Sequence, residues 1–378
     1  MLSSSIVRRV TKRSDVHFRR LSSSFSTPKY SIYVSQSTDP YFNLSVEDWL
    51  FRHKDPENPL LFIYRDKPCI VVGRNQIPWK EINLTALRDM PSVPFVRRRS
   101  GGGTVYHDLG NTNYSIHLPR HSFDRSVTAQ IILRAVRSLG VNAHVNDRND
   151  ICVESKKIRI QLSHSHQWSL IHISGSAYKI VKNRAYHHGT MLISTQLETL
   201  GELLRSKKDS MLTKGVASVP SPVCNLRQHN DKISHEQFCE AAISEFRRVY
   251  DISEEVQRIS ENTDLVDLDD VHKGVTELSS WEWAYGQTPE FTYTKNVVFE
   301  WGNLAAKIQS KHGIILNSSV RISNAAASVS EGLIQEIEDM AASLAGQRYG
   351  SIPPDALISS GISPKEDVQW WLHDMMWN

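Results

Sequence analysis

The segment Arg97–Asn111, RRRSGGGTVYHDLGN, most constrains the fold of this 378-residue chain. Three arginines run into three glycines at the end of a β-rich stretch, Pro94–Arg99. Arginine makes planar, bidentate contacts with phosphate or carboxylate, and consecutive glycines let backbone N–H groups approach an anion. The segment is neither a Walker A loop, since no Gly-Lys-Ser/Thr follows, nor a dinucleotide-binding fingerprint, since its glycines are contiguous. From these residues alone, a phosphate or nucleotide site and a basic hairpin turn both remain open.

The composition predicts a globular protein with room for two domains, because 40% of the residues are hydrophobic and 22% are charged. No run of about 18 apolar residues occurs, so we expect no membrane-spanning helix. The four cysteines are scattered without a Cys-x-x-Cys pair, which argues against a disulfide framework and a zinc ribbon. His164 and His166 lack a nearby acidic or cysteine ligand, so no metal site is predicted.

Residues 1–29 carry seven lysines and arginines against one aspartate, and they are rich in serine. This composition is typical of a mitochondrial transit peptide and predicts the mitochondrial matrix as destination, with a disordered basic tail as the alternative. Because the net charge of the whole chain is only +3, the remainder is slightly acidic. A slightly acidic folded part does not favour a nucleic-acid partner.

Hydrophobic periodicity predicts alternating strands and helices from about residue 31 onward. Helices are expected at Asn43–His53, Ser126–Gly140 and Ser234–Tyr250, and strands within Pro59–Gly73, Pro94–Arg99, Asn113–Leu118, Val145–Val153 and Ile173–Val181. The acidic stretch Glu254–His272 has no clear period, so we expect a surface connection there.

The pattern changes after Pro289. Alternating segments near Asn296–Ile308 and Gly313–Ile322 precede expected helices at Ser330–Leu344 and from Pro364 to the end. Strands followed by helices predict a small module of mixed structure. The sequence therefore predicts an α+β fold with parts at 31–288 and 290–378.

Several ordered segments resemble the motifs of lipoate–protein ligases, within the biotin/lipoate ligase superfamily, and in particular mitochondrial members of fungal type. Besides RRRSGGGTVYHDLGN they are VGRNQ (Val72–Gln76), DRNDI (Asp147–Ile151), ISGSAYK (Ile173–Lys179), AYHHGTML (Ala185–Leu192), KGVASVPSPVCNL (Lys214–Leu226) and WEWAYGQTP (Trp281–Pro289). The resemblance implies a catalytic domain of mixed sheets flanked by helices at 31–288. Residues 290–378 resemble the small C-terminal accessory domain of the longer ligases.

The resemblance also implies a two-step reaction. Lipoate attacks the α-phosphate of ATP to give lipoyl-AMP, with Mg²⁺ accompanying the nucleotide, and a lysine of the acceptor then takes the lipoyl group. The implied acceptors are lipoyl domains of 2-oxo-acid dehydrogenase E2 subunits and the glycine-cleavage H protein, and a monomer is expected. Two alternatives stay open: an amidotransferase that moves lipoyl or octanoyl groups without using ATP, and an inactive homologue that binds lipoyl domains.

Motif positions assign residue roles by resemblance. Arg98 is expected at the adenylate phosphate, supported by Arg97 or Arg99. The nucleotide cradle and the acyl tunnel are assigned to Gly101, Gly102, Gly103, Thr104, Val105 and Tyr106, and His107 with Asp108 is expected to fix the next strand. Asn149 and Asp150 are expected to face the phosphates or a metal ion. The ligand groove is assigned to Ser174, Gly175, Ser176 and Ala177, with His187 or His188 nearby. Cys224 is not expected to be a nucleophile, because no motif places a base beside it.

The sequence departs from the family at one position. A lysine that bridges the acyl carboxylate and the phosphate usually precedes Ile-Ser-Gly-Ser-Ala, but here the residue before Ile173 is His172. Lys157 lies earlier, and removing Arg159–His172 would bring it close to that motif. Three interpretations compete: a tolerated loop that leaves Lys157 at the site as the catalytic lysine, a translated intron, or a replacement of lysine by His172.

Overall fold

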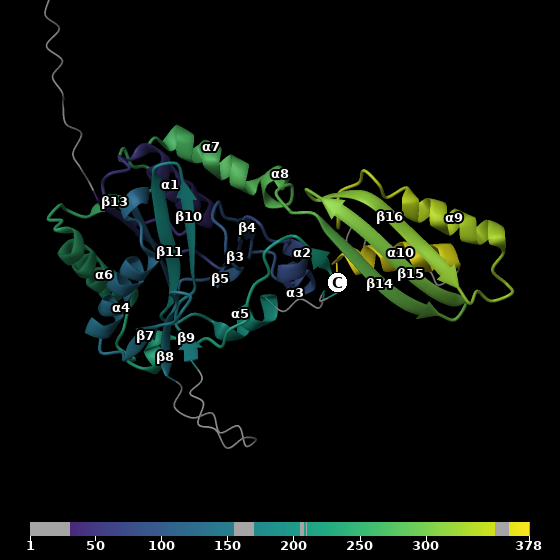
Figure 1. Ribbon diagram of the computed structural model, residues 1–378, viewed down its shortest axis with the longest axis horizontal. Helices are drawn as coiled ribbons and strands as arrows, with labels where there is room; N and C mark the ends of the chain where they lie inside the picture. Colours follow the sequence, from purple (N-terminus) through teal and green to yellow (C-terminus); the bar gives the residue numbers. More distant parts are fainter. Residues whose placement is uncertain (1–30, 155–169, 205–207, 209, 352–362, 378) are drawn as a thin grey trace, which may run out of the picture.

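The computed structural model describes residues 31–154, 170–204, 208, 210–351 and 363–377. These residues form an elongated molecule whose larger part, built on a six-stranded sheet, is followed by a smaller C-terminal part (Figure 1). The helices are α1 (Pro40–His53), α2 (Pro78–Glu81), α3 (Leu84–Arg88), α4 (Arg125–Ser138), α5 (Leu197–Leu203), α6 (His235–Tyr250), α7 (Leu268–Ser279), α8 (Trp281–Ala284), α9 (Glu331–Ala342) and α10 (Pro364–Trp377). The strands are β1 (Ile32–Ser35), β2 (Leu60–Tyr64), β3 (Cys69–Val72), β4 (Phe95–Arg97), β5 (Val105–His107), β6 (Asn111–Pro119), β7 (Ala143–Val145), β8 (Ile151–Glu154), β9 (Leu170–His172), β10 (Ser176–Val181), β11 (Arg184–Leu192), β12 (Leu212–Thr213), β13 (Gln257–Ile259), β14 (Phe291–Phe299), β15 (Gly302–Lys311) and β16 (Ile314–Ser323).

The central sheet has the strand order β10-β11-β6-β2-β1-β13. β1 runs parallel to its neighbours β2 and β13, and the remaining pairs are antiparallel. Successive side chains of a strand point to opposite faces. Ile32 and Val34 accordingly join the core beneath α4 and α6, whereas Tyr33 joins the core beneath α1 and α7. The larger part is therefore a sheet covered by helices on both faces.

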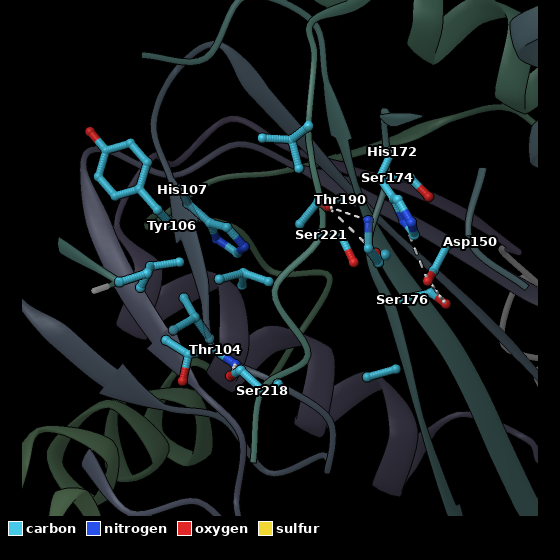
Figure 2. A pocket seen from close by; sticks show the side chains of 18 of the residues that line it. Thr104, Tyr106, His107, Asp150, His172, Ser174, Ser176, Thr190, Ser218 and Ser221 are labelled. Carbon is cyan, nitrogen blue, oxygen red and sulfur yellow. Dashed lines mark hydrogen bonds and ion pairs between the residues drawn. The ribbon is translucent and has the colours of Figure 1, made fainter. Parts of the chain in front are cut away.

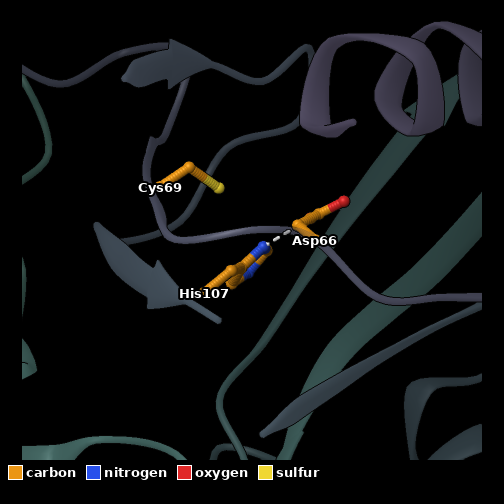
Figure 3. A group of neighbouring side chains, drawn as sticks. All are labelled: Asp66, Cys69 and His107. Carbon is orange, nitrogen blue, oxygen red and sulfur yellow. Dashed lines mark hydrogen bonds and ion pairs between the residues drawn. The ribbon is translucent and has the colours of Figure 1, made fainter. Parts of the chain in front are cut away.

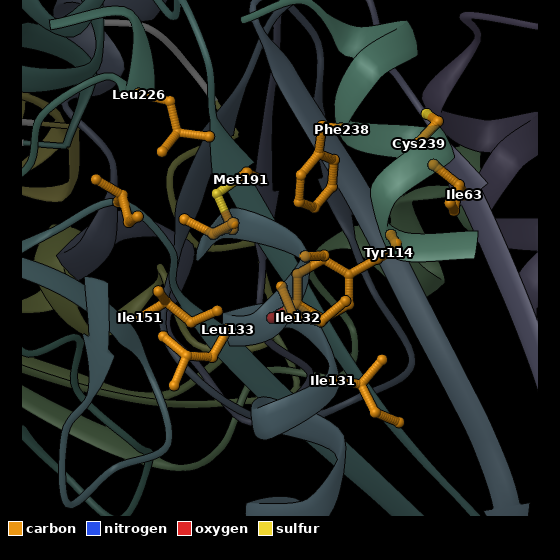
Figure 4. Close-up of a cluster of buried hydrophobic side chains, with 14 of the residues drawn as sticks. Ile63, Tyr114, Ile131, Ile132, Leu133, Ile151, Met191, Leu226, Phe238 and Cys239 are labelled. Atoms are coloured by element: carbon orange, nitrogen blue, oxygen red, sulfur yellow. The ribbon is translucent and has the colours of Figure 1, made fainter. Parts of the chain in front are cut away.

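The main core lies between the central sheet and helices α4 and α6. Figure 4 shows aliphatic residues of α4 packed against Met191 and Tyr114 of the sheet, with Phe238 of α6 beside them. Ser234 and Gln237 form a capping box at the start of α6. The helix predictions for this core are confirmed, because both amphipathic segments bury their apolar faces here.

Strand β6, predicted at Asn113–Leu118, is buried on both of its faces. Its alternation suggests one buried face, but all nine of its residues are buried because it lies between β2 and β11 under helices on both sides. The polar face, which carries Asn111, Asn113, Ser115 and His117, is thus inside the protein. Buried polar groups require partners, so this face holds a hydrogen-bonded network rather than a solvated surface.

Two small sheets complete the larger part. β3 pairs with β4 in parallel and with β5 in antiparallel, which places the segment 97–107 next to Val72–Gln76. β7, β8 and β9 form an antiparallel sheet that carries the Asp147–Ile151 turn. The stretch Glu254–His272 lies mostly at the surface, as expected, but it also contributes β13 to the central sheet and begins α7. The sequence did not predict β13, because this strand is only three residues long and shows no periodicity.

The C-terminal part is a sheet of order β12-β14-β15-β16 with α9 and α10 packed together beside it. The predicted segment Asn296–Ile308 spans two of its strands. The predicted boundary after residue 288 falls just before β14, but β12 joins this sheet from the larger part. Trp79 of α2 packs against Phe291 and Tyr349, so one apolar cluster is continuous across the junction. No helix among the described residues is long and apolar enough to cross a membrane.

Candidate active site

A pocket of about 630 Å³ opens between the central sheet and the β4-β3-β5 sheet. Thr104 and His107 lie on one side of it, and Asp150 and Ser176 lie on the other (Figure 2). The segment 216–223, which carries Ser218, runs between these sides. Protein pockets of roughly 300–1,000 Å³ are typical ligand sites. The structure therefore brings several separate sequence motifs to one ligand-sized cavity.

The guanidinium of Arg98 organises the glycine loop. Its Nη2 donates to the carbonyl oxygens of Gly101 (2.6 Å) and Gly103 (2.7 Å), and its Nη1 donates to that of Val71 (3.1 Å). Its Nε donates to the hydroxyl of Ser100 at 3.0 Å. Burial lowers the pKa of Arg98 to about 10, so the side chain stays charged at neutral pH. Its charge lies at the pocket wall, while its donors fix the shape of the loop.

The two neighbouring arginines have other partners. Arg97 is fully buried, and its Nε donates to the carbonyl oxygen of Ala284 at 2.8 Å. Arg99 lies over the ring of Trp283 at 4.6 Å and forms an ion pair with Asp48 at 3.4 Å. These two arginines therefore anchor α8 and α1 to the loop rather than facing the pocket.

Gln76 joins three chain segments at the pocket wall. Its Oε1 accepts hydrogen bonds from the Gly73 N–H and the Thr104 hydroxyl, both at 2.8 Å. Its Nε2 donates to the hydroxyl oxygen of Ser218 at 3.0 Å, and this oxygen also accepts from the Thr104 N–H at 2.9 Å. The Ser218 N–H donates to the carboxylate of Glu81 in α2 at 3.2 Å. The Val72–Gln76 motif thus fixes the glycine loop against the segment 216–223.

Two glycines are required by this geometry. Gly102 has φ +88°, and a Cβ atom there would lie 2.8 Å from both the Ala177 Cβ and the Arg98 Nη2. A Cβ atom on Gly73 would collide with the carbonyl oxygen of Gly102. Glycine alone combines a positive φ with such close approach at low cost. The glycines therefore permit both the turn of the loop and its packing on β10.

The opposite wall is built around Asp150. Asn149 has φ 66°, and the side chain of Asn146 accepts hydrogen bonds from the backbone of Arg148 (2.9 Å) and Asp150 (3.0 Å). Asparagine readily stabilises turns in this way. The Ser176 hydroxyl donates to Asp150 Oδ1 at 3.0 Å, and Arg148 Nε lies 3.4 Å from Oδ2. The turn therefore presents a partly neutralised carboxylate to the pocket.

His172 ends β9 and faces this carboxylate. It pairs with Cys152 of β8, and its N–H donates to the carbonyl oxygen of Pro222 at 2.9 Å. Its Nδ1 lies 3.6 Å from Asp150 Oδ2, and burial lowers the pKa of His172 despite that carboxylate. The position directly before Ile173 is therefore a pocket position, held in a strand.

The adjacent histidines of β11 point to opposite faces of the sheet. His188 lines the pocket, with Nε2 2.8 Å from the Ser100 hydroxyl and Nδ1 3.0 Å from Glu47 Oε1. Burial alone would raise the pKa of Glu47, but the contacts with His188, Ser115 and Lys179 together lower that pKa. His187 is bonded to Thr128 at 2.6 Å on the α4 side, where burial lowers its pKa to about 3. The expectation of His187 near the ligand does not agree with this placement, whereas that of His188 does.

A buried cluster adjoins the pocket. Asp66 follows β2 and is fully buried, and its Oδ2 accepts hydrogen bonds from His107 Nδ1 (2.8 Å) and Asn113 Nδ2 (3.2 Å). Its Oδ1 accepts from Asn43 Nδ2 at 2.8 Å. Cys69 completes the cluster (Figure 3), and burial raises the pKa of its thiol well above the usual value. The polar face of β6 thus supports a histidine in the pocket wall.

Comparison with known proteins decides the family. The lipoyl protein ligase A/B catalytic domain matches residues 39–247. A Schizosaccharomyces pombe protein provisionally named lipoate-protein ligase A is 39% identical over 280 residues, covering 69% of this chain and 72% of its own length. The lipoate-protein ligase A of Psychrobacter cryohalolentis is 34% identical over 292 residues, covering 76% and 81%. The chain belongs to the lipoate–protein ligase A family. It is thus an enzyme of the ligase class.

Solved structures show that this ligase shares its fold with distant relatives. P. falciparum LipL1, crystallised with lipoate, has a TM-score of 0.55 at 24% identity, covering 91% of this chain and 99% of that chain. A lipoate-protein ligase A bound with ATP has a TM-score of 0.51 at 21% identity, covering 68% and 98%. The predicted α+β class is confirmed.

The ligase pocket contains many of the residues assigned by motif position. Those that line it are Arg98, Gly103, Thr104, Val105, Tyr106, His107, Asp150, Ser174, Gly175, Ser176 and Ala177. Gly101, Gly102 and Asn149 shape its walls from behind. Asp108 accepts hydrogen bonds from the backbone of Gly110 (2.9 Å) and Gln196 (2.8 Å), so it fixes turns. Lys157, the expected catalytic lysine, lies outside the described residues, as do His164 and His166.

Sequence reasoning gave no role to four residues that build the ligase pocket. Gln76 and Ser218 lie inside the quoted motifs, so a search for polar residues within those motifs could have found them. Glu47 lies on a helix, and no motif in the sequence marks it as a site residue. Asp66 lies in a segment whose sequence suggests only a turn. Their burial depends on the long-range packing of α1 and β6, which no local pattern shows.

Proposed function

We propose that this ligase activates lipoate with ATP and transfers the lipoyl group to a lysine of an acceptor protein. The observation that carries the proposal is the contact of Gln76 with both Thr104 and Ser218, which closes the glycine loop over a pocket backed by the charge of Arg98. A cavity of about 630 Å³ with apolar and polar walls suits an acyl chain joined to a nucleotide.

The chemistry of both steps fits these groups. Lipoate's carboxylate attacks the α-phosphate and releases pyrophosphate, and the acceptor amine then attacks the mixed anhydride and releases AMP. Both steps place negative charge on oxygen, which preorganised donors and fixed cations stabilise. The backbone N–H groups of Gly102 and Gly103 have no protein acceptor among the described residues. These donors and the buried charge of Arg98 are the groups available to the developing oxyanion.

Mg²⁺ fits one wall of this pocket. It prefers carboxylate, phosphate and water oxygens, and Asp150 is a pocket carboxylate, although Ser176 and Arg148 already contact its two oxygens. Glu81, the other pocket carboxylate, has its pKa raised by burial and accepts the Ser218 N–H. When bound at Asp150, Mg²⁺ would neutralise phosphate charge.

The acceptors we propose are lipoyl domains of 2-oxo-acid dehydrogenase E2 subunits and the glycine-cleavage H protein. Membership of the lipoate–protein ligase A family supports this choice. The amidotransferase alternative, if it used a cysteine acyl-enzyme, would need an ionised thiol. Burial raises the pKa of Cys69, Cys152, Cys224 and Cys239, which are all the cysteines of the chain. This burial favours direct transfer from an adenylate.

Lipoate-dependent exchange of labelled pyrophosphate into ATP tests the proposal. Exchange is expected together with ATP-dependent lipoylation of a lipoyl domain. Transfer from supplied lipoyl-AMP without exchange would instead support the amidotransferase, and failure of both would support the inactive binding homologue.

The segment that precedes Ile173 needs its own test. Deletion of residues 158–172 would join Lys157 to Ile173 and place its amine at the pocket position that His172 holds beside Asp150. We expect higher pyrophosphate exchange from this variant, and also from His172→Lys, which keeps the segment. A well-folded deletion variant with no gain would count against both the translated-intron interpretation and an activating role of this position.

We further propose that residues 1–29 direct the ligase to the mitochondrial matrix, on the composition of that segment. Import of the full chain into isolated mitochondria, with shortening of its N-terminus, is the expected result. A chain that stays outside and intact would contradict it.

A further inference from the structure

We propose that His107 is the general base that deprotonates the acceptor lysine, and that Asp66 is the positioning residue that orients it. The inference rests on the proposed ligase function and adds a catalytic residue for its second step. An amine must lose its proton to attack a carbonyl, and a lysine ammonium with its ordinary pKa of about 10.4 is protonated at neutral pH. The pocket must therefore supply a proton acceptor.

The hydrogen bonds around His107 determine its tautomer. The fully buried carboxylate of Asp66 can only accept, and it already accepts from Asn43 and Asn113. Asn113 Nδ2 also lies 3.4 Å from His107 Nδ1, but it is closer to Asp66 Oδ2, at 3.2 Å. The shorter 2.8 Å contact of His107 with Asp66 therefore places a proton on Nδ1, which leaves the lone pair on Nε2. His107 lines the pocket (Figure 2) and bonds to Asp66 through Nδ1 (Figure 3). Its Nε2 has no hydrogen-bond partner among the described residues. A carboxylate held behind an imidazole also stabilises the imidazolium that forms when Nε2 takes a proton.

The other candidate bases of the pocket are engaged. His188 uses both ring nitrogens, in contacts with Ser100 and Glu47. The ring nitrogens of His172 lie between Asp150 and Arg148, and that carboxylate also accepts the Ser176 hydroxyl. His107 alone among the described pocket histidines has one nitrogen fixed by a carboxylate and the other facing the cavity.

The proton and bond changes balance without another reactant. The acceptor ammonium gives one proton to His107 Nε2, and its nitrogen then forms a bond to the lipoyl carbonyl carbon. The bond between that carbon and the AMP oxygen breaks, and the electron pair leaves with AMP. The amide nitrogen loses its second proton to solvent, and His107 returns its proton to AMP or solvent.

A metal site in the same cluster is the alternative explanation for these residues. The ligand atoms of Asp66, Cys69 and His107 lie within 4.8 Å of one another. However, His107 Nδ1 already bonds to Asp66, and burial keeps the thiol of Cys69 protonated, whereas a metal binds the thiolate. Cys69 would be a ligand in a metal site, but it has no part in proton transfer to His107. A Cys69 variant is therefore a matched control.

The test separates the two half-reactions in the full chain. Single-turnover transfer from supplied lipoyl-AMP to a lipoyl domain is compared for the wild type, His107→Gln and Asp66→Asn, with lipoate-dependent pyrophosphate exchange measured alongside. We expect His107→Gln to slow transfer by about 10²–10⁴-fold, as for loss of a general base, and to slow exchange by a much smaller factor. Asp66→Asn is expected to slow transfer also, because an amide can donate to Nδ1 and favour the wrong tautomer.

Hydroxylamine separates a base from a positioning group, because it is already unprotonated at neutral pH. We expect His107→Gln to retain transfer to hydroxylamine and to lose transfer to lysine, with imidazole restoring the latter in His107→Ala. Cys69→Ala is expected to transfer at the wild-type rate. Equal loss with both nucleophiles, or wild-type transfer by His107→Gln, would overturn the proposal, and loss in Cys69→Ala would favour the metal.

Failure of the ligase proposal is distinguishable from failure of this one. A wild-type chain with neither exchange nor transfer contradicts the proposed function itself. A wild-type chain that ligates while its folded His107 variants transfer normally contradicts only the role of His107. Thermal unfolding of each variant checks folding, and the His107→Ala rescue decides the matter if the Gln variant is unstable.

Discussion

The amide of Gln76 donates to the hydroxyl oxygen of Ser218 over 3.0 Å, although the two residues are 142 positions apart in the sequence. Both side chains also bond to Thr104, so the contact locks the glycine loop in place. We expect Gln76→Leu to lower the free energy of unfolding by about 1–3 kcal/mol for each buried group left without a partner. Urea unfolding and calorimetric titration with ATP check this, and weaker ATP binding is expected.

Gln335→Leu, on the exposed surface of α9, is the control for that change and should alter neither quantity. Wild-type stability in Gln76→Leu would show that the loop holds its shape without the amide.

Arg98→Lys tests whether the loop needs a guanidinium or only a charge. Lysine offers a point charge and cannot reach the carbonyl oxygens of Gly101, Gly103 and Val71 together. We expect a lower melting temperature and a loss of pyrophosphate exchange. Arg148→Lys, at an exposed position, is the matched control for stability.

The sequence alone assigns Arg98 to the phosphate, so Arg98→Ala should weaken adenylate binding in a stable protein. The structure leads us to expect lost stability as well. If Arg98→Lys keeps the wild-type melting temperature, the carbonyl contacts are dispensable.

Buried histidines predict that stability falls in mild acid. Burial lowers the pKa of His187 to about 3, that of His235 to about 4, and that of His117 well below its usual value. Below the unfolded pKa of about 6.5 the unfolded chain binds protons that the folded chain does not, so stability rises with pH up to that value. Each histidine contributes at most about 1.4 kcal/mol per pH unit. Chemical unfolding at pH 5.0 and 6.5 should show the slope, and His187→Gln should reduce it.

Lys208 predicts a second pH effect, above neutrality. Burial lowers its pKa to about 7, while its Nζ donates to the carbonyl oxygen of Met376 at 2.6 Å. Between pH 7 and the unfolded pKa of about 10.4, the unfolded chain binds the extra proton, so stability should rise with pH. Unfolding of Lys208→Met from pH 7 to 9.5 should lack this rise, whereas the exposed Lys307→Met should keep it. An unchanged rise in Lys208→Met would contradict the assignment.

Local patterns predicted the elements whose faces differ most in polarity. The helix Ser234–Tyr250 carries both its capping box and its apolar stripe in the sequence, and α6 has both. The same reasoning failed for β13, which is too short for any period. It also gave no burial to the polar face of β6, because a single strand does not reveal that α1 covers it.

The structure places Gly103 and Asp150 at the pocket, in agreement with their motif positions. Residues that act only through another side chain could not be predicted. Asp66, for example, bonds to His107, but its position in the sequence suggests only a turn. Such residues become visible only when separate strands come together.

The short helix α2 touches both parts of the molecule. Glu81 accepts the backbone N–H of Ser218 at the pocket, and Trp79 is packed against Phe291 and Tyr349 in the C-terminal part. A displacement of the C-terminal part that moved Trp79 would also move Glu81, because both residues belong to this one turn of helix. If the placement of the C-terminal part changes the affinity of the pocket for a ligand, binding of that ligand must change the preferred placement in turn. The two effects are reciprocal and have the same coupling free energy.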